Sequence, residues 1–181
     1  MLWLYSQEKT EIFSRPLRLL HIAPEYPLYK AFKDTPAIDY VSAGLDAAFI
    51  RVEMDLVYTA FKPDLFEVII CCHVLEHIIG DVAAMRELRR VLKPGGLAFL
   101  QSPLDYRREV SFEDPNCRTL EARARVFGQS DHVRIYGRDY NNRLEEAGFT
   151  GNVEEYAKTL PPDTIRRYGL IAEEAMYICT K

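Results

Sequence analysis

The residues best suited to chemistry lie in the stretch HVLEH, from His73 to His77. On a helix, the spacing H-x-x-E-H places two histidines one turn apart to bind zinc, with the glutamate as a base. Here an apolar run leads directly into His73 and Gly80 soon follows His77, so the long helix that the pattern requires is not predicted. We therefore expect no metal, and a histidine hydrogen-bonded at a strand end is the alternative role for His77.

A second stretch of interest follows the apolar run 17–22, where the chain reads Ala23, Pro24 and Glu25. A nucleotide-binding fold places a glycine-rich turn at this point, because glycine adopts positive φ and lets the backbone approach a ligand. Pro24 instead fixes its own φ and donates no hydrogen bond. We expect this loop to take a different path from a glycine-rich one.

The elements that must position these residues are predicted from apolar patterning. Strands are expected at 17–22, 38–43, 50–54, 66–72, 97–102, 153–157 and 175–180, and the almost continuously hydrophobic fourth one should be central. A helix is expected from an N-cap at Asp81 to the stop at 94–96, and others at 119–127 and 138–147, the last with Gly148 as its C-cap. Tyr26, Tyr29 and Phe32 are predicted to form the inward stripe of a short helix, with pocket lining as the alternative.

Strands that alternate with helices predict an α/β open sheet. Ligands of such sheets bind beyond the carboxyl ends of the strands. The connection 45–49 is too short for a helical crossover between the second and third strands, so the third strand should be stunted or absent.

Length and composition favour one domain, 1–181, because 181 residues with 48% hydrophobic content suffice for a single core. With 23 basic and 27 acidic residues the chain lacks a basic footprint, so no nucleic acid is expected as a partner. Four cysteines without a CxxC pair indicate a reduced, cytoplasmic protein. No apolar run is long enough for a signal peptide or membrane span, so no membrane is expected.

The segment 66–103, FEVIICCHVLEHIIGDVAAMRELRRVLKPGGLAFLQSP, resembles the central segment of class I S-adenosylmethionine-dependent methyltransferases of the small-molecule type. The resemblance is close there and looser over 17–149. It implies a Rossmann-like, doubly wound, mostly parallel sheet with an antiparallel last strand, here with a shortened region between strands 2 and 3. The implied cofactor is S-adenosylmethionine, converted to S-adenosylhomocysteine, with no metal.

The resemblance also implies where the cofactor binds. The first loop supports the methionine part, an acid ending the second strand holds the ribose, and an acid ending the third lies beside adenine. These roles fall on Ala23-Pro24-Glu25, on Gly44 and on Asp55, and of these only Asp55 matches the family. The residues implied to bind cofactor are His21, Ala23, Pro24, Glu25, Gly44, Leu45, Asp46, Asp55, Leu56, His73 and Val74.

Two departures define a subfamily with an atypical, glycine-poor first motif. His21 stands in place of the usual acid of the first strand, and Gly44 in place of the ribose-binding acid, for which Asp46 or Glu25 could substitute. The combination of LHIAPE with DHVRIYG at 131–137 is similar to a recurring pattern of a bacterial methyltransferase-like group. The altered loop is therefore interpreted as a subfamily variant.

Residues 103–136 are predicted to form an insertion that covers the cleft and carries the acceptor site. Methyl transfer depends on near-attack geometry, and it needs a base only if the acceptor must lose a proton. The candidates are His132, with a loop-anchoring role as its alternative, His77 and, less favoured, Tyr106; Asp105 could simply cap a turn.

These observations predict a methyltransferase that acts on a small or modest-sized acceptor. The main alternative is a methyltransferase-like binding or scaffold protein without catalysis, favoured by the missing glycines and by Gly44. A nicotinamide-dependent oxidoreductase is disfavoured because no G-x-G-x-x-G follows a strand. Neither the acceptor nor the oligomeric state is predicted.

Overall fold

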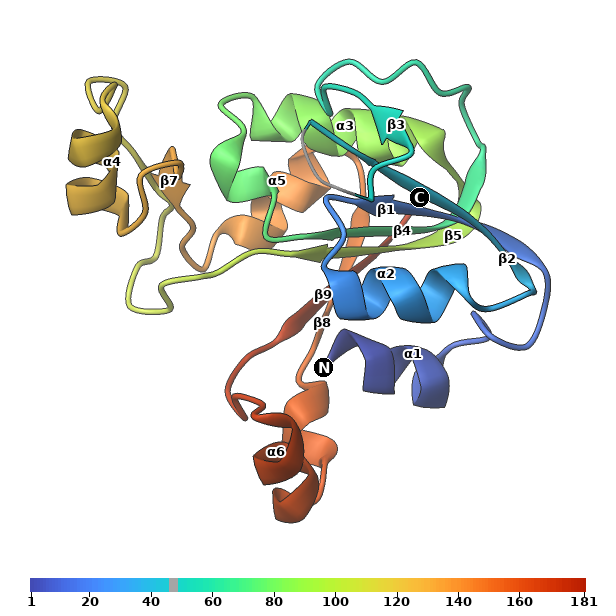
Figure 1. The fold of residues 1–181 in the computed structure, drawn as a ribbon. Helices are drawn as coiled ribbons and strands as arrows, with labels where there is room; N and C mark the ends of the chain where they lie inside the picture. The colour runs from blue at the N-terminus through green and yellow to red at the C-terminus, as the bar shows by residue number, and fades with distance from the viewer. Residues whose placement is uncertain (46–48) are drawn as a thin grey trace.

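A computed structural model describes residues 1–45 and 49–181, and within them a seven-stranded sheet forms the centre of the molecule (Figure 1). Its order is β3-β2-β1-β4-β5-β9-β8. The first five strands are parallel, whereas β9 runs antiparallel to both of its neighbours, β5 and β8. The strands are β1 (Leu17–Ile22), β2 (Ile38–Gly44), β3 (Val52–Glu53), β4 (Phe66–Cys72), β5 (Leu92–Gln101), β8 (Thr150–Glu154) and β9 (Met176–Thr180). The predicted doubly wound sheet with an antiparallel last strand is confirmed.

Helices cover both faces of this sheet (Figure 1). On one face, α3 (Asp81–Val91) and α5 (Tyr140–Glu146) contribute Met85, Leu88 and Leu144 to the larger core cluster. On the other, α1 (Leu2–Lys9) and α2 (Tyr26–Lys33) lie over a second cluster that contains Leu19, Phe32 and Ile70. Because β4 is buried from both sides, its side chains are apolar on both faces, as its sequence predicts.

The short third strand is also confirmed, because β3 contains only two residues. It begins eight positions after the end of β2 at Gly44, too few for the chain to form a crossover helix. Hydrogen bonds from Arg51 N–H to Ser42 O (3.1 Å) and from Met54 N–H to Gly44 O (2.9 Å) hold this edge against β2.

Helix α3 differs from the prediction at both ends. Gly80 occupies the N-cap position, and Asp81 is the first helical residue, with its carboxylate in a buried polar network instead. The helix ends at Val91 and the chain passes at once into β5. Pro94-Gly95-Gly96 forms an irregularity in that strand, because Leu92 pairs with Phe66 but the next pair is Leu97 with Val68, and Gly95 has φ +72°.

Helix α5 ends as predicted at a left-handed glycine, Gly148, with φ +93°. Gly148 N–H donates to Glu145 O (2.8 Å) and Phe149 N–H donates to Leu144 O (3.1 Å), the hydrogen bonds of a Schellman motif. Phe149 and Leu144 are both buried in the larger core, so this cap fixes the approach of the chain to β8.

The segment between β5 and α5 folds into a small lobe of its own (Figure 1). It contains β6 (Phe112–Glu113) paired antiparallel with β7 (Arg134–Ile135), and α4 (Leu120–Phe127), which begins at the predicted place. Thr119 caps α4 by accepting a hydrogen bond from Ala122 N–H at 3.1 Å. In Figure 1 the lobe projects beyond α3 and α5, away from the middle of the sheet.

Six short elements of the described residues were not predicted: the strands β6 and β7, the helices α1 and α6 (Pro162–Tyr168), and the 3₁₀ turns η1 (Leu75–His77) and η2 (Tyr156–Thr159). The aromatic stripe of α2 is only partly inward. Phe32 is buried, but Tyr26 is 58% exposed, and Tyr26 and Tyr29 pack against Phe49. No helix among the described residues is both long and apolar enough to cross a membrane.

Candidate functional site

A cavity of about 510 Å³ opens where β1, β2, β3 and β4 end. Seven of the residues predicted to bind cofactor line it: Ala23, Gly44, Leu45, Asp55, Leu56, His73 and Val74. The other lining residues are Ile22, Ile50, Met54, His77, Ile78 and Asp131. The carboxyl ends of parallel strands meet at one edge of a sheet, and this brings residues from four separate segments to one cavity.

The first loop reaches this cavity through Ala23, which has φ +44°. A left-handed backbone usually selects glycine, because the Cβ atom of other residues crowds the following carbonyl. Ala23 N–H donates to Ala43 O at 2.8 Å and ties the loop to the end of β2. The lack of glycine therefore does not keep the loop out of the left-handed region.

Gly44 lies directly opposite this loop. A Cβ atom at Gly44 would lie 3.6 Å from Ala23 N and 2.7 Å from Ile50 Cδ1. A side chain at position 44 would therefore require the Ile50 side chain to move, and Cδ1 is the flexible end of that half-buried residue. Asp46, predicted as a substitute, lies outside the described residues.

Asp55 keeps its predicted place beyond the end of β3. One carboxylate oxygen, Oδ1, accepts a hydrogen bond from Val57 N–H at 2.9 Å. Leu56 beside it is buried, while Val74 comes from the turn after β4, so an acid and two apolar side chains share this part of the cavity.

His21, Pro24 and Glu25 were predicted to bind cofactor, but none of them lines this cavity. His21 is fully buried under α2, where its Nδ1 shares a hydrogen bond with the Tyr40 hydroxyl at 3.0 Å. Burial lowers the pKa of His21 and outweighs the opposing effect of Glu25, whose Oε2 lies 3.7 Å from His21 Nε2. Side chains alternate across a strand, so His21 and Ile22 face opposite sides of the sheet. Ile22 lines the cavity, whereas His21 packs against Phe32 of α2.

A second cavity, of about 310 Å³, adjoins the first and shares His73 with it. Residues from the start of α1, the ends of β4 and β5 and the approach to β9 line it, and Glu25 is among them. His73 has φ +56°, and its Nδ1 lies 3.7 Å from Glu76 Oε1. Glu25 therefore belongs to the neighbouring cavity.

The candidate catalytic histidines come together across a long stretch of chain. The rings of His77 and His132 form an edge-to-face pair with centroids 4.7 Å apart. Glu76 is 2% exposed and accepts a hydrogen bond from Ser102 Oγ at 3.1 Å, while Asp131 Oδ2 lies 3.3 Å from His77 Nδ1. Burial, with a further contribution from the His77 charge, lowers the pKa of His132.

The insertion is held against this site by Arg134, which is 1% exposed. Its guanidinium donates to three backbone carbonyls in and just after η1: Leu75 O (2.7 Å), Ile78 O and Ile79 O (2.8 Å). Val133 N–H donates to Glu76 O at 3.0 Å. These bonds place residues 131–132 beside η1. The carbonyls of Ile78 and Ile79 are available to Arg134 because they follow a single 3₁₀ turn that no helix continues.

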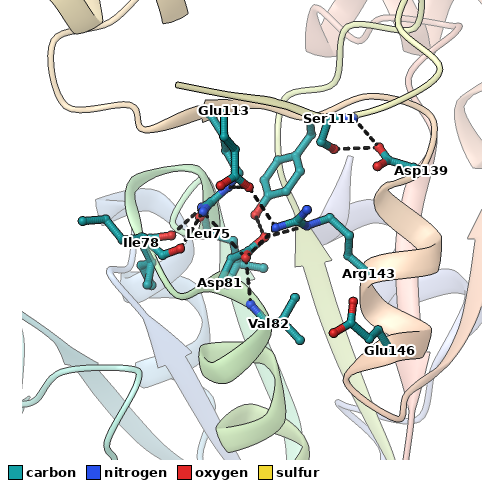
Figure 2. Close-up of polar contacts among 12 residues, drawn as sticks. Leu75, Ile78, Asp81, Val82, Ser111, Glu113, Asp139, Arg143 and Glu146 are labelled. Carbon is teal, nitrogen blue, oxygen red and sulfur yellow. Dashed lines mark hydrogen bonds and ion pairs between the residues drawn. The ribbon is translucent and has the colours of Figure 1, made fainter. Parts of the chain in front are cut away.

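Asp81 forms the other end of this attachment (Figure 2). Its carboxylate accepts hydrogen bonds from Tyr136 Oη (2.8 Å) and from Arg143 Nε and Nη2 (2.9 and 2.8 Å). Arg134 Nη2 lies 3.6 Å from Asp81 Oδ1, and Arg143 also donates to Glu113 at 2.9 Å. We call these five residues, Asp81, Glu113, Arg134, Tyr136 and Arg143, the clamp.

The clamp explains why a carboxylate can be buried at the start of α3. Burial by itself would raise the pKa of Asp81, but the hydrogen bonds from Arg143 and Tyr136 and the charge of Arg134 outweigh it and hold the pKa below its usual range. The segment is thus attached by paired buried charges as well as by the packing of Tyr136 in the larger core.

Tyr106 is placed away from the first cavity and is not among its lining residues. Its hydroxyl accepts a hydrogen bond from Ala175 N–H at 3.4 Å. Asp105 binds Arg107 through Nε at 2.8 Å and accepts from Arg107 N–H at 3.2 Å, in agreement with the turn-capping alternative.

Sequence reasoning missed Asp131 as a cavity residue and the clamp as a whole. The signal was present, because DHVRIYG contains Asp131, His132, Arg134 and Tyr136, but a motif does not reveal which turn it will contact. The role of Asp81 was concealed because an acid at the start of a helix is also a common N-cap.

Comparisons with known proteins agree with this geometry. The structure is similar to an S-adenosylmethionine-dependent methyltransferase from Mesorhizobium loti, with a TM-score of 0.60, 17% identity and 92% of each chain covered. The CurJ carbon methyltransferase gives a TM-score of 0.57 at 15% identity, over 99% of this chain and 51% of that one. The cyclase SpnF gives 0.60 at 15%, over 92% and 74%.

Likeness at such low identity shows the fold alone, and a cyclase shares that fold with methyltransferases. A search of curated protein sequences finds no match. The sequence model of the methyltransferase domain family, however, matches residues 16–155, from just before β1 to just after β8. The chain therefore belongs to the methyltransferase domain family, with the fold of its class I, S-adenosylmethionine-dependent members.

Proposed function

We propose that this methyltransferase binds S-adenosylmethionine in the cavity at the ends of β1 to β4 and transfers its methyl group to a small-molecule acceptor. The observation that carries the proposal is that seven of the residues implied by the family resemblance to bind cofactor line one cavity. Its volume of about 510 Å³ lies within the range of small-molecule sites, about 300–1,000 Å³.

The residues of the cavity fit the cofactor unequally. Asp55 would accept a hydrogen bond from the adenine of the cofactor, and Leu56 and Val74 would pack against the adenine ring. Backbone of the left-handed loop at Ala23 would face the methionine part, where Gly44 leaves room because it has no side chain. With no acid at position 44, we expect weaker ribose binding than in relatives with that acid.

The bound cofactor would supply an electrophilic methyl group, and the chain would position the acceptor in line with it. We assign the acceptor side to His77, which lines the cavity beside Asp131, and to His132, which packs against His77. These imidazoles are placed to contact an acceptor and receive its proton where one must leave. Asp131 and His132, near the end of segment 103–136, would border the acceptor site, whereas the lobe that the rest of this segment forms projects away from the middle of the sheet (Figure 1).

Thermal unfolding with and without S-adenosylhomocysteine tests the cofactor assignment. A ligand at a hundred times its Kd stabilises the native state by about 2.7 kcal/mol, so wild-type protein should show a clear rise in Tm. Asp55→Ala should reduce this rise, because it removes the carboxylate that we place beside adenine. No shift at millimolar ligand would contradict cofactor binding.

Asp105→Ala provides the matched control. Asp105 is an acid in a turn beyond a strand end, but it binds Arg107 and does not line the cavity. The ligand-induced rise in Tm should therefore stay close to the wild-type value in this variant. Equal losses for Asp55→Ala and Asp105→Ala would contradict the placement of adenine.

A further inference from the structure

We infer that Glu76, His77 and His132 bind a divalent transition-metal ion at the rim of the cofactor cavity. One ligand atom from each residue can be chosen so that all three lie within 4.8 Å of one another. Two imidazole nitrogens and a carboxylate oxygen form a common ligand set for zinc and related ions. The inference contradicts our expectation from the sequence that no metal binds. In the metal-bound protein it also replaces the proton-accepting role of His77 and His132, because the lone pair of a coordinated imidazole nitrogen is no longer free to take a proton.

The geometry requires only a modest contraction. Ligand atoms about 2.1 Å from a shared ion can lie no more than about 4.2 Å apart. Small side-chain rotations of His77, which is half-buried, would close the remaining gap. The backbone of the two segments is already joined, since Val133 N–H donates to Glu76 O at 3.0 Å.

The Glu76 carboxylate gives a second, independent reason. It is 2% exposed, yet no Lys or Arg lies within ion-pair distance of it among residues 1–45 and 49–181. The carboxylate accepts a hydrogen bond from Ser102 Oγ at 3.1 Å through Oε2, and His73 Nδ1 lies 3.7 Å from Oε1. A buried carboxylate needs a compensating cation, and Asp81, the other buried acid nearby, has two arginines for this purpose.

Neighbouring groups are placed as they are around metal-binding side chains. Ser102 orients the Glu76 carboxylate, and Asp131 Oδ2 lies 3.3 Å from His77 Nδ1, where it can orient the imidazole ring. Hydrogen-bonded partners of this kind fix the ring and raise the basicity of a ligand. Arg134 holds the segment that carries Asp131 and His132 in place.

The cluster differs from the H-x-x-E-H site considered for the sequence. That site would use both histidines of HVLEH on a helix, but His73 has φ +56° and precedes a single 3₁₀ turn. Here His132 replaces His73 as the second imidazole. Three protein ligands leave a coordination position of the ion open. Because His77 is both a ligand and a lining residue of the cavity, the ion would lie at the edge of that cavity.

The ligand set also predicts which ions bind. Mg²⁺ and Ca²⁺ prefer sites built from oxygen ligands, whereas Zn²⁺ and Co²⁺ bind imidazole readily. We therefore expect the protein, once treated with a chelator and dialysed, to bind one equivalent of Co²⁺ with visible absorption bands. Zn²⁺ should displace the Co²⁺, and excess Mg²⁺ should not.

Three variants test the ligands by the same Co²⁺ titration. His77→Ala, His132→Gln and the isosteric Glu76→Gln should each weaken Co²⁺ binding at least tenfold. His73→Ala, the matched control from the same motif, should keep the wild-type affinity, because His73 is not one of the three ligands. Circular dichroism and the Tm of each variant identify any that fails to fold, and the other two then decide.

Two results would overturn the inference. One is wild-type protein that binds Co²⁺ no better than the variants do; the other is His73→Ala losing as much affinity as His77→Ala, which would favour the H-x-x-E-H pair. The titration needs no methyl donor, so it is independent of the cofactor proposal. A Tm shift with S-adenosylhomocysteine but no Co²⁺ binding rejects the metal site alone.

Discussion

The cofactor loops and the insertion meet at the same end of the sheet, but different forces hold them there. The loop at Ala23 adopts a left-handed backbone and is tied to the end of β2 by a backbone hydrogen bond, from Ala23 N–H to Ala43 O at 2.8 Å. The insertion is attached by buried charges, with Arg134 bonded to three carbonyls and Asp81 bonded to Tyr136 and Arg143.

This difference suggests a division of tasks. Backbone contacts tolerate changes of side chain, which is how a glycine-poor first loop can persist in a methyltransferase sheet. A network of buried charges tolerates little change, because removing one partner leaves the others unpaired. We therefore expect substitutions in the clamp to affect stability most, and those in the loops to affect mainly ligand binding.

The largest effect should come from Asp81→Ala. Removing this carboxylate leaves Arg134 and Arg143 without their buried partner, and breaking a buried pair costs about 3–5 kcal/mol. Urea unfolding measures the change. Glu146→Ala is the control, since its ion pair with Arg86 at 3.2 Å is exposed and should contribute less than about 1 kcal/mol. Similar losses for the two variants would contradict the contrast between clamp and surface.

The clamp should also give a defined dependence on pH. The pKa of Asp81 is lower in the folded protein than in the unfolded chain, so its stabilising contribution is complete above the unfolded value of about 4 and is lost as the pH falls through the folded value. The stability difference between wild type and Asp81→Asn should be constant from pH 7 to 5 and shrink below about pH 4. A difference that grows on acidification would show that the folded pKa is raised instead.

A smaller effect is expected for Gly44→Asp, which restores the acid of the family to the cofactor side. Its Cβ would meet Ile50 Cδ1 at 2.7 Å, and because that methyl group is the flexible end of a half-buried side chain we expect a loss of about 1 kcal/mol, at the low end of overpacking costs. In the background of Ile50→Ala the same substitution should cost less, which a double-mutant cycle measures. Additive losses would mean that Ile50 is not the obstacle.

The smallest effect, and of opposite sign, is expected for Ala23→Gly. Relief of the left-handed strain at φ +44° should exceed the added entropy of the unfolded chain, for a net stabilisation of about 1 kcal/mol or less. Ala31→Gly within α2 should destabilise by about 1 kcal/mol, because glycine is a poor helix former. Destabilisation by both glycines would argue against strain in the first loop.

Several parts of the fold were predictable because they depend on local patterns. The bounds of β1 and β4 match the apolar runs 17–22 and 66–72, and the short connection after β2 predicted a stunted β3. The start of β5 lies five residues before the predicted one, because Leu92 already pairs with β4, but Pro94-Gly95-Gly96 interrupts the pairing between Leu92 and Leu97 as a turn-forming sequence would. Extended backbone before proline is favoured, and this allows β5 to begin at Leu92.

The candidate site was predictable only in part. Position beyond a strand end was enough to select Asp55, Gly44 and His73, because parallel strands present their carboxyl ends together. It was not enough for His21, because strand periodicity shows that His21 and Ile22 face opposite sides but not which side holds the ligand. Only the packing of α2 over His21 decides that.

By itself, the sequence determined the order of strands and helices, the family and the unusual composition of the first loop, since apolar periodicity, turn residues and a long motif are all local properties. The tertiary structure alone decided that His132 and Asp131 lie against Glu76 and His77. That meeting depends on Arg134 and Asp81 closing a long loop onto a short 3₁₀ turn. Such contacts follow from the balance of buried charge and chain entropy across the whole fold, which no single segment of sequence contains.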